Sequence, residues 1–308
     1  MKLVFTNVLI LFILMFIGYI LGKREVIKHT SISDLTNLLI DVSIPATIIV
    51  SMIRPYSPEL MKDTFRVLFI MTVYHLSVVA IAYFVTKIIK VDKKDVGGWI
   101  FGMVFSNNGF IGYPLMYAIY GNEGLFIMAM GNIVQNILIF SLGVKLITMN
   151  YETKEKISIK NILFTRQNAA ILVGMILFVG EVKVPEPVVS LLTYLSNLTA
   201  PLSMIVVGLS LSRYKVKDMF TDKEAYRLTV FRMVIVPMVI LFIFKLTNIS
   251  ANNDLPYAIM FYTAALPSPA LLAIMAERYN TSTTFSSRCV FLTTLASVLT
   301  VPIFAGLL

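Results

Sequence analysis

Long apolar runs alternate with short polar connections along the whole chain. A bilayer core of about 30 Å needs about 20 apolar residues in one helix. Ten segments meet or approach this length, and they predict an all-α integral membrane protein with spans at residues 3–22, 34–53, 65–90, 96–120, 124–149, 166–184, 188–212, 226–247, 255–277 and 283–306. The first run is long and lacks a small-residue cleavage site, so it is predicted to be a retained helix rather than a signal peptide.

The composition supports a surface that faces lipid. Apolar residues make up 57% of the 308 residues and charged residues only 14%, whereas a soluble domain carries about 25% charged residues. Membrane lipid is therefore an expected partner. Cys289 is the single cysteine, so an intrachain disulfide is excluded. One cysteine and two histidines are also too few ligands for a structural zinc or iron–sulfur site. We find no enzyme motif and expect neither a metal nor another cofactor.

The basic residues predict an orientation. The net charge is +9, and the lysines and arginines fall in short tracts between apolar runs. Nineteen of them lie in one alternating set of connections and six in the other. Lys and Arg favour cytoplasmic connections, so both termini are predicted outside the cell membrane. The same rule explains the charge without a nucleic acid partner.

An internal repeat divides the chain into two halves. The stretch 18–21 recurs at 174–177, and 42–45 recurs at 198–201, both at an offset of 156 residues. The hydrophilic stretch 150–165 lies between a first five-helix repeat at 1–149 and a second at 166–308. Because five is odd, the second half would enter the membrane from the opposite side, and such inverted repeats are typical of secondary transporters. The alternative is an ancient duplication in a channel or receptor.

The fourth helix of each predicted half contains a helix-breaking stretch. Segment four carries Gly112 and Pro114, and segment nine carries Pro267 and Pro269. Proline removes an amide donor and clashes with the preceding turn. Non-helical backbone at membrane depth is tolerated only beside protein or a water-filled cavity, and paired interruptions point to a transport site. The alternative is a pair of simple proline kinks.

These interruptions predict a site for a negatively charged cargo. Half-helices expose free N–H groups at positive dipole ends, which suit a carboxylate. Asn107, Asn108 and Ser268 add neutral donors without the cost of a buried cation. We therefore expect a secondary transporter that moves a small organic anion by alternating access.

Three ionisable residues lie inside predicted spans and have open roles. Asp41 precedes Pro45 by one turn, and it either binds a coupling proton or forms an ion pair with a cation such as Arg232. A structural ion pair or a position nearer the interface is the alternative. His75 is a candidate proton relay, although a lone helical histidine is more often a hydrogen-bonded packing residue.

At the interrupted segments the chain resembles the auxin efflux carrier family, which includes plant PIN-FORMED carriers and bacterial malate or malonate permeases. Residues 107–115 look like the family's N-x-x-x-x-G-x-P-L motif, and 264–267 look like its A-A-L-P motif. Arg232 and Pro237 fit its R-x-x-x-x-P motif. The resemblance spans all ten segments.

The family resemblance implies a domain organisation, a cargo and an oligomeric state that the residues alone do not indicate. It implies a scaffold of helices 1, 2, 6 and 7, a transport domain of helices 3–5 and 8–10, and helices 4 and 9 that cross at paired prolines. It also implies a carboxylate cargo such as malate or a related dicarboxylate, a homodimer, and substrate contacts from Asn107 and Asn168. The short linker departs from the long central loop of the plant carriers, and Ser268-Pro269 departs from the second motif.

Three other functions stay open at this stage. A sodium-coupled organic-anion symporter needs several converging oxygen ligands, and the interrupted segments supply few acidic ones. A membrane sensor would bind the ligand without moving it. A pore would conduct without saturation.

Overall fold

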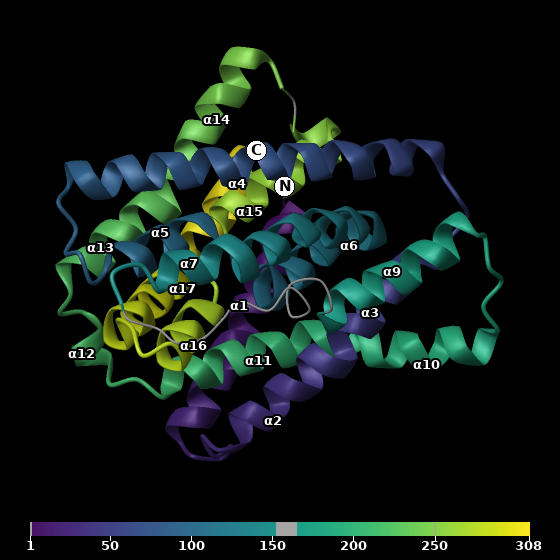
Figure 1. Cartoon of the computed structure of the whole chain (residues 1–308). Coiled ribbons are helices and arrows are strands. Elements are labelled where there is room, and N and C mark those ends of the chain that lie inside the picture. The colour runs from purple at the N-terminus through teal and green to yellow at the C-terminus, as the bar shows by residue number, and fades with distance from the viewer. Residues whose placement is uncertain (1, 152–164, 250) are drawn as a thin grey trace. The chain divides into compact units, whose positions relative to one another are not determined.

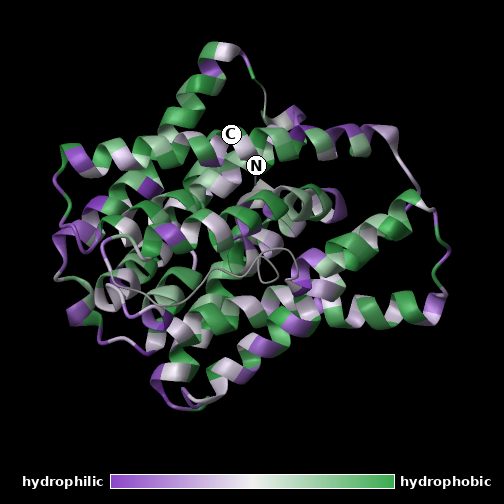
Figure 2. Cartoon of the chain, in the orientation of Figure 1, coloured by the Kyte–Doolittle hydropathy of each residue, from purple (hydrophilic) through white to green (hydrophobic). Residues whose placement is uncertain are grey.

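Helices form all the regular secondary structure of the described residues. The structure is a computed structural model, and it describes residues 2–151, 165–249 and 251–308. Most of the predicted linker at 150–165 therefore lies outside the described residues. Hydrophobic residues follow the helices, and hydrophilic residues gather in the connections (Figure 2).

Several of these helices fit a bilayer by length and composition. The six stretches of the described chain that are long and apolar enough are Ser31–Met52, Pro58–Ile88, Val96–Ile147, Glu186–Ser212, Lys223–Thr247 and Thr283–Leu307. Shorter apolar helices cover Val8–Lys23, Arg166–Val179 and Leu255–Ala265. An integral membrane protein with several spans agrees with the sequence analysis, while the number ten and the inverted repeat stay predictions.

The first half begins with a long helix and an interrupted one (Figure 1). Its elements are α1 (Lys2–Lys23), α2 (Ser31–Leu38), η1 (Leu39–Ser43), α3 (Ile44–Met52), α4 (Pro58–Ile88), α5 (Val96–Val104), η2 (Asn108–Gly112), α6 (Tyr113–Leu138), η3 (Ile139–Gly143) and α7 (Val144–Ile147). Within α6, Gly121 has φ 62° and ψ −148°. Glycine tolerates this backbone, and the kink falls at the predicted boundary between segments four and five.

The second half has the same kinds of element. They are α9 (Arg166–Val179), α10 (Glu186–Asn197), α11 (Thr199–Ser212), α12 (Val216–Met219), α13 (Lys223–Val230), η4 (Phe231–Ile235), α14 (Val236–Thr247), η5 (Ala251–Asn253), α15 (Leu255–Ala265), α16 (Leu271–Arg278) and α17 (Thr283–Leu307).

A π-helical turn precedes a proline in each half. Pro45 lies in the first turn of α3 directly after η1, and Pro237 lies in the first turn of α14 directly after η4. The Ile44 N–H donates to the Leu39 carbonyl and the Val236 N–H to the Phe231 carbonyl. A proline cannot continue the normal ladder, so the preceding turn widens. Such turns frequently occur at functional sites.

The described chain divides into two compact units that do not coincide with the sequence halves. Unit 1 comprises Met1–Phe65, Gly109–Met130 and Phe164–Lys215, and unit 2 comprises Arg66–Asn108, Gly131–Leu163 and Val216–Leu308. Each unit therefore draws helices from both halves. Their roles as scaffold and transport domain stay a prediction.

Glycines let α1 and α11 approach closely within unit 1. A Cβ atom added at Gly208 would lie 1.9 Å from the Met15 carbonyl oxygen, and one at Gly18 would lie 2.3 Å from the Ile205 carbonyl oxygen. Small residues at helix contacts are a usual packing device in membranes. The two helices therefore pack backbone to backbone.

Residues with positive φ pair up between the halves. Glu25 (φ 54°) and Glu181 (φ 48°) follow α1 and α9 at the 156-residue offset seen in the sequence. Lys90 and Asn248 both have φ 55° near the ends of α4 and α14. Left-handed backbone is uncommon for residues other than glycine. Its recurrence at corresponding helix ends is the pattern that the predicted repeat would produce.

Candidate functional site

The first interruption lies between α5 and α6. Phe105 is extended (φ −95°, ψ 150°) directly after α5 ends at Val104, and the helical path resumes at Asn108 in η2. Pro114 lies in the first turn of α6, directly after the π-helical turn η2, as Pro45 and Pro237 do after η1 and η4. The proline therefore lies beyond the break rather than at it. The break itself lies at 105–107, at the start of the predicted 106–114 stretch.

The second interruption lies between α15 and α16. Leu266 is extended (φ −71°, ψ 152°), and residues 266–270 are not helical. Pro267 and Pro269 both fall inside this break. Proline disfavours the helical region for the residue before it, which explains why α15 ends immediately before Leu266.

The two interruptions are hydrogen-bonded to each other within unit 2. The Asn107 backbone N–H donates to the Pro267 carbonyl at 2.9 Å. The Ser106 hydroxyl donates to the Thr263 carbonyl near the end of α15 at 2.6 Å. The Ser268 hydroxyl donates to the Gly102 carbonyl near the end of α5 at 2.7 Å. Each break thus supplies a serine that caps the C-terminus of the other helix, and free carbonyls there are satisfied.

Ser268 was expected to donate to a ligand, but its proton is used by Gly102. Its side chain is fully buried, and its backbone N–H donates to the Thr293 hydroxyl at 3.2 Å. Its position and bonds are those of a residue that joins helices. In this arrangement the Ser268 hydroxyl donates within the protein, and a ligand role for Ser268 stays a prediction.

Arg232 lies at the same junction and is fully buried. Its guanidinium donates to the carbonyls of Leu266 (3.0 Å), Met103 (2.7 Å) and Thr263 (2.9 Å), to the Tyr74 hydroxyl (3.3 Å) and, in a short contact, to the Ser106 hydroxyl. These five partners are neutral and use the five N–H donors of the side chain.

Buried amides surround the first interruption. Gln135 accepts from the Ser106 N–H at 3.0 Å and donates to the Ser106 carbonyl at 2.9 Å. The Ser106 N–H can only donate, so this pair fixes which end of the Gln135 amide is which. The Asn108 amide group donates to the Asn132 side-chain oxygen at 3.1 Å.

One polar atom of this cluster is left without a hydrogen bond in the described structure. It is the side-chain oxygen of Asn108, which is buried. Such a buried atom calls for an explanation, and a role in binding a ligand is one. Sequence reasoning missed Asn132 and Gln135. Polar amides inside a long apolar helix were the available signal, because intramembrane polar groups are costly and frequently functional.

Asp41, for which the sequence suggested a coupling proton or an ion pair, forms an ion pair with Arg166. The Asp41 carboxylate lies 2.9 Å from the Arg166 guanidinium within unit 1, with both side chains partly exposed. Arg232 instead has the five neutral partners given above. Asp41 belongs to η1 and Arg166 begins α9, so the pair joins two elements that the linear sequence keeps apart.

Asn168 lies in the first turn of α9 in unit 1. Its N–H donates to the hydroxyl of the capping residue Thr165 at 3.1 Å. The fold thus places Asn107 and Asn108 in unit 2, and Asn168 with Asp41 in unit 1. His75 is buried in unit 2, where its ring nitrogens contact the Met71 carbonyl at 2.7 Å and Gln135 at 3.4 Å. These contacts are those of a packing residue.

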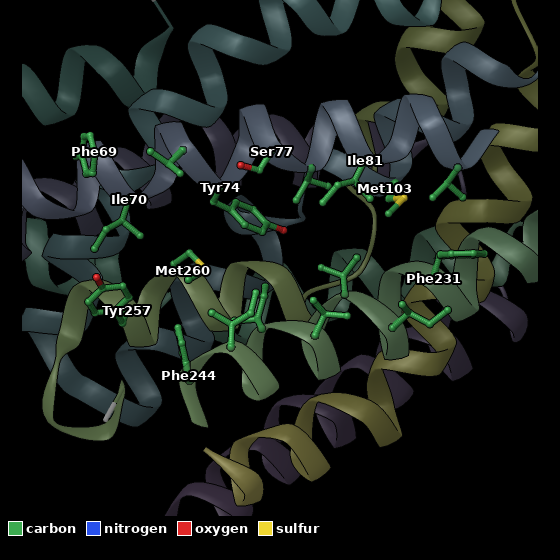
Figure 3. A pocket seen from close by; sticks show the side chains of 18 residues that line it. Phe69, Ile70, Tyr74, Ser77, Ile81, Met103, Phe231, Phe244, Tyr257 and Met260 are labelled. Atoms are coloured by element: carbon green, nitrogen blue, oxygen red, sulfur yellow. The ribbon is translucent and has the colours of Figure 1, made fainter. Parts of the chain in front are cut away.

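An apolar cavity of about 510 Å³ lies elsewhere in unit 2 (Figure 3). Its wall is formed by α4, η4, α14 and α15, with Met103 at the end of α5. None of the predicted ligand residues lines it. Tyr74 and Met103 belong both to this wall and to the partners of Arg232. The cavity offers few polar groups, so it does not fit a charged cargo.

Comparisons with known proteins give the family. The profile of the family described as "Membrane transport protein" matches residues 3–305. A relative named as an uncharacterized transporter of Methanocaldococcus jannaschii is 25% identical over 98% of this chain and 97% of its own length. A similarly named protein of Methanothermobacter thermautotrophicus is 26% identical over 98% and 97%, and the transporter YfdV of Escherichia coli K12 is 21% identical over 96% and 95%.

The match extends from the first helix to the last, so no region of the fold lies outside it. It also confirms the resemblance that the two interrupted segments indicated. The chain therefore belongs to the membrane transport protein family, the auxin efflux-like family of integral membrane transporters.

Proposed function

We propose that the protein is a secondary carrier that moves a small organic carboxylate across the cell membrane by alternating access. The observation that carries this proposal is the junction of two interrupted helices, tied by the hydrogen bond from the Asn107 N–H to the Pro267 carbonyl. Interrupted helices of this kind hold the substrate in many secondary transporters.

The local chemistry supports an anionic cargo. Beyond each break a new helical segment begins, and helix N-termini favour negative charge. The carbonyl ends of α5 and α15 are occupied by Arg232, Ser106 and Ser268, so these carbonyl oxygens are not turned toward an anion. Within unit 2, we assign the side-chain amide of Asn107 to the carboxylate of the cargo.

Asn108 has a different proposed role. Its amide group is used by Asn132, and its side-chain oxygen is the buried atom without a partner. An acceptor beside an anion site suits a cargo that also carries a hydroxyl or a protonated carboxyl. We therefore include Asn108 as an acceptor rather than as the donor expected from sequence.

Two related halves give a physical route to alternating access. The positive-φ pair Glu25 and Glu181 supports the repeat independently of the side chains on which it was first recognised. Halves of opposite orientation can exchange conformations, which opens the same site to either side in turn. The distribution of lysine and arginine supports both termini outside.

Counterflow in proteoliposomes tests the function. Vesicles loaded with an unlabelled dicarboxylate such as malate should accumulate the labelled compound transiently, and the initial rate should saturate. Binding without accumulation would favour a sensor, and flux without saturation would favour a pore. A rate that requires a sodium gradient would favour the sodium-coupled symporter. No exchange with any of a panel of mono- and dicarboxylates would contradict the proposed cargo.

A further inference from the structure

Arg232 presents an electrostatic problem that the proposed carrier mechanism does not address. It is a fully buried cation whose hydrogen-bond partners in the described part of the chain are three backbone carbonyls and two hydroxyls. Buried charges in proteins are normally paired with opposite charge or bind a metal. Among the described residues, the compensating negative charge therefore comes from groups other than a carboxylate.

The compensating charge is found at two helix ends. Met103 lies in the last turn of α5, and Thr263 and Leu266 lie at the end of α15. The C-terminus of a helix carries about half a negative elementary charge. Two such ends that meet at one point carry about one negative charge together, which a single guanidinium balances.

The same two ends would repel each other without a cation between them. Broken helices of transporters commonly place a sodium ion or a proton at such carbonyl ends. The five oxygen atoms around Arg232 are of the kind that bind such a cation. Here a side chain delivered by the π-helical turn η4 occupies the position.

We propose that Arg232 is a tethered counter-ion that takes the place of a coupling cation at the junction of the two interrupted helices. A guanidinium fixed to η4 cannot leave with the cargo, so the junction keeps its charge through the transport cycle. Transport consequently needs no sodium or potassium ion at this point. Arg232 is a positioning residue, because it contacts the helix ends rather than the proposed ligand residues.

Thermal unfolding of purified protein in detergent tests the counter-ion role without any transport assay. Arg232→Ala should lower the melting temperature, and low-millimolar guanidinium chloride should restore half or more of the loss. The same salt should not stabilise the wild-type protein or Arg288→Ala, which removes a partly buried arginine that pairs with Asp222. Equal sodium chloride controls for ionic strength. Absence of a loss in Arg232→Ala, or equal rescue in Arg288→Ala, would overturn the proposal.

Two further variants separate charge from hydrogen bonding and keep the test decisive if Arg232→Ala does not fold. Arg232→Lys keeps the charge with fewer donors, and Arg232→Gln keeps donors without the charge. The lysine variant should melt at the higher temperature of the two. A glutamine variant as stable as the lysine variant would show that the charge is dispensable and would overturn the proposal.

A transport measurement gives a further test, and this test rests on the proposed function. Carboxylate flux by the wild-type protein should be equal in sodium, potassium and choline media, and a requirement for either metal ion would contradict a tethered counter-ion. If no carboxylate is transported at all, the proposed function fails while the melting experiments still decide the role of Arg232.

Discussion

The Ser268 hydroxyl donates to the Gly102 carbonyl at 2.7 Å, across 166 residues of sequence. The Ser106 hydroxyl makes the matching bond to Thr263. Two interruptions in two different helices therefore satisfy each other's carbonyl groups. This reciprocity explains how non-helical backbone can be buried without leaving its polar groups unpaired.

Removing either serine hydroxyl should destabilise this junction. Ser268→Ala leaves the Gly102 carbonyl buried without a partner, and such a loss costs about 1–3 kcal/mol. Thermal unfolding in detergent measures the effect. Ser141→Ala serves as the control, because the Ser141 hydroxyl in η3 donates to the Ile137 carbonyl, just four residues earlier at the end of α6. An equal effect of both substitutions would argue against a special role for the reciprocal bonds.

Asn107→Ala should impair transport while leaving the fold intact. The substitution keeps the backbone bond to Pro267 and removes only the side-chain amide. If that amide binds the cargo, the KM for the carboxylate should rise at least about tenfold. A tenfold change is about 1.4 kcal/mol, and a hydrogen bond to a charged group contributes about 1.5–3 kcal/mol. Initial-rate measurements in proteoliposomes check it. A wild-type KM in this variant would remove Asn107 from the site.

Gly208→Ala should disrupt the packing of α1 on α11. The added methyl group would lie 1.9 Å from the Met15 carbonyl oxygen, so one helix must move, and overpacking of this kind typically costs about 1–3 kcal/mol. Gly306→Ala is a matched control, because an added Cβ there meets no atom within 4 Å. The melting temperature of the control should stay near that of the wild type, and an equal loss in both variants would contradict the close approach.

Asp95 should make stability fall with rising pH. Burial raises the pKa of its carboxyl above the ordinary value of 3.8, while the hydrogen bond from Ser282 opposes part of the rise. Between the ordinary and the raised pKa, the folded state holds a proton that the unfolded state has lost, so stability decreases through that window. Asp95→Asn should remove this component. The difference in melting temperature between the two proteins should therefore grow with pH and then level off.

Asp41→Asn separates the two roles considered for Asp41. As half of a partly exposed ion pair with Arg166, the carboxylate should contribute at most about 1 kcal/mol to stability. We expect the substitution to leave the response of carboxylate flux to a pH gradient unchanged. Loss of that response, with normal expression and melting temperature, would instead assign proton coupling to Asp41.

The sequence was sufficient for the features that depend on local composition and spacing. Hydrophobic length predicted helical spans, and the prolines predicted interruptions near 106 and 267, because both effects act within a few residues. The motifs of the two interrupted segments also indicated the family that the full-length comparison confirms. Glycine and proline matches at one offset indicated a repeat that the paired positive-φ residues support.

The partners of the polar side chains were decided only by tertiary structure. A sequence shows that Arg232, Asp41 and Ser268 are polar groups in apolar surroundings, and each must find a partner there. Which partner it finds depends on helix ends and helices brought together from more than a hundred residues away, as for Ser268 with Gly102 and Asp41 with Arg166. The sequence could not show that backbone carbonyls balance the charge of Arg232. A helix C-terminus can balance a charged side chain only when the folded structure places the two next to each other.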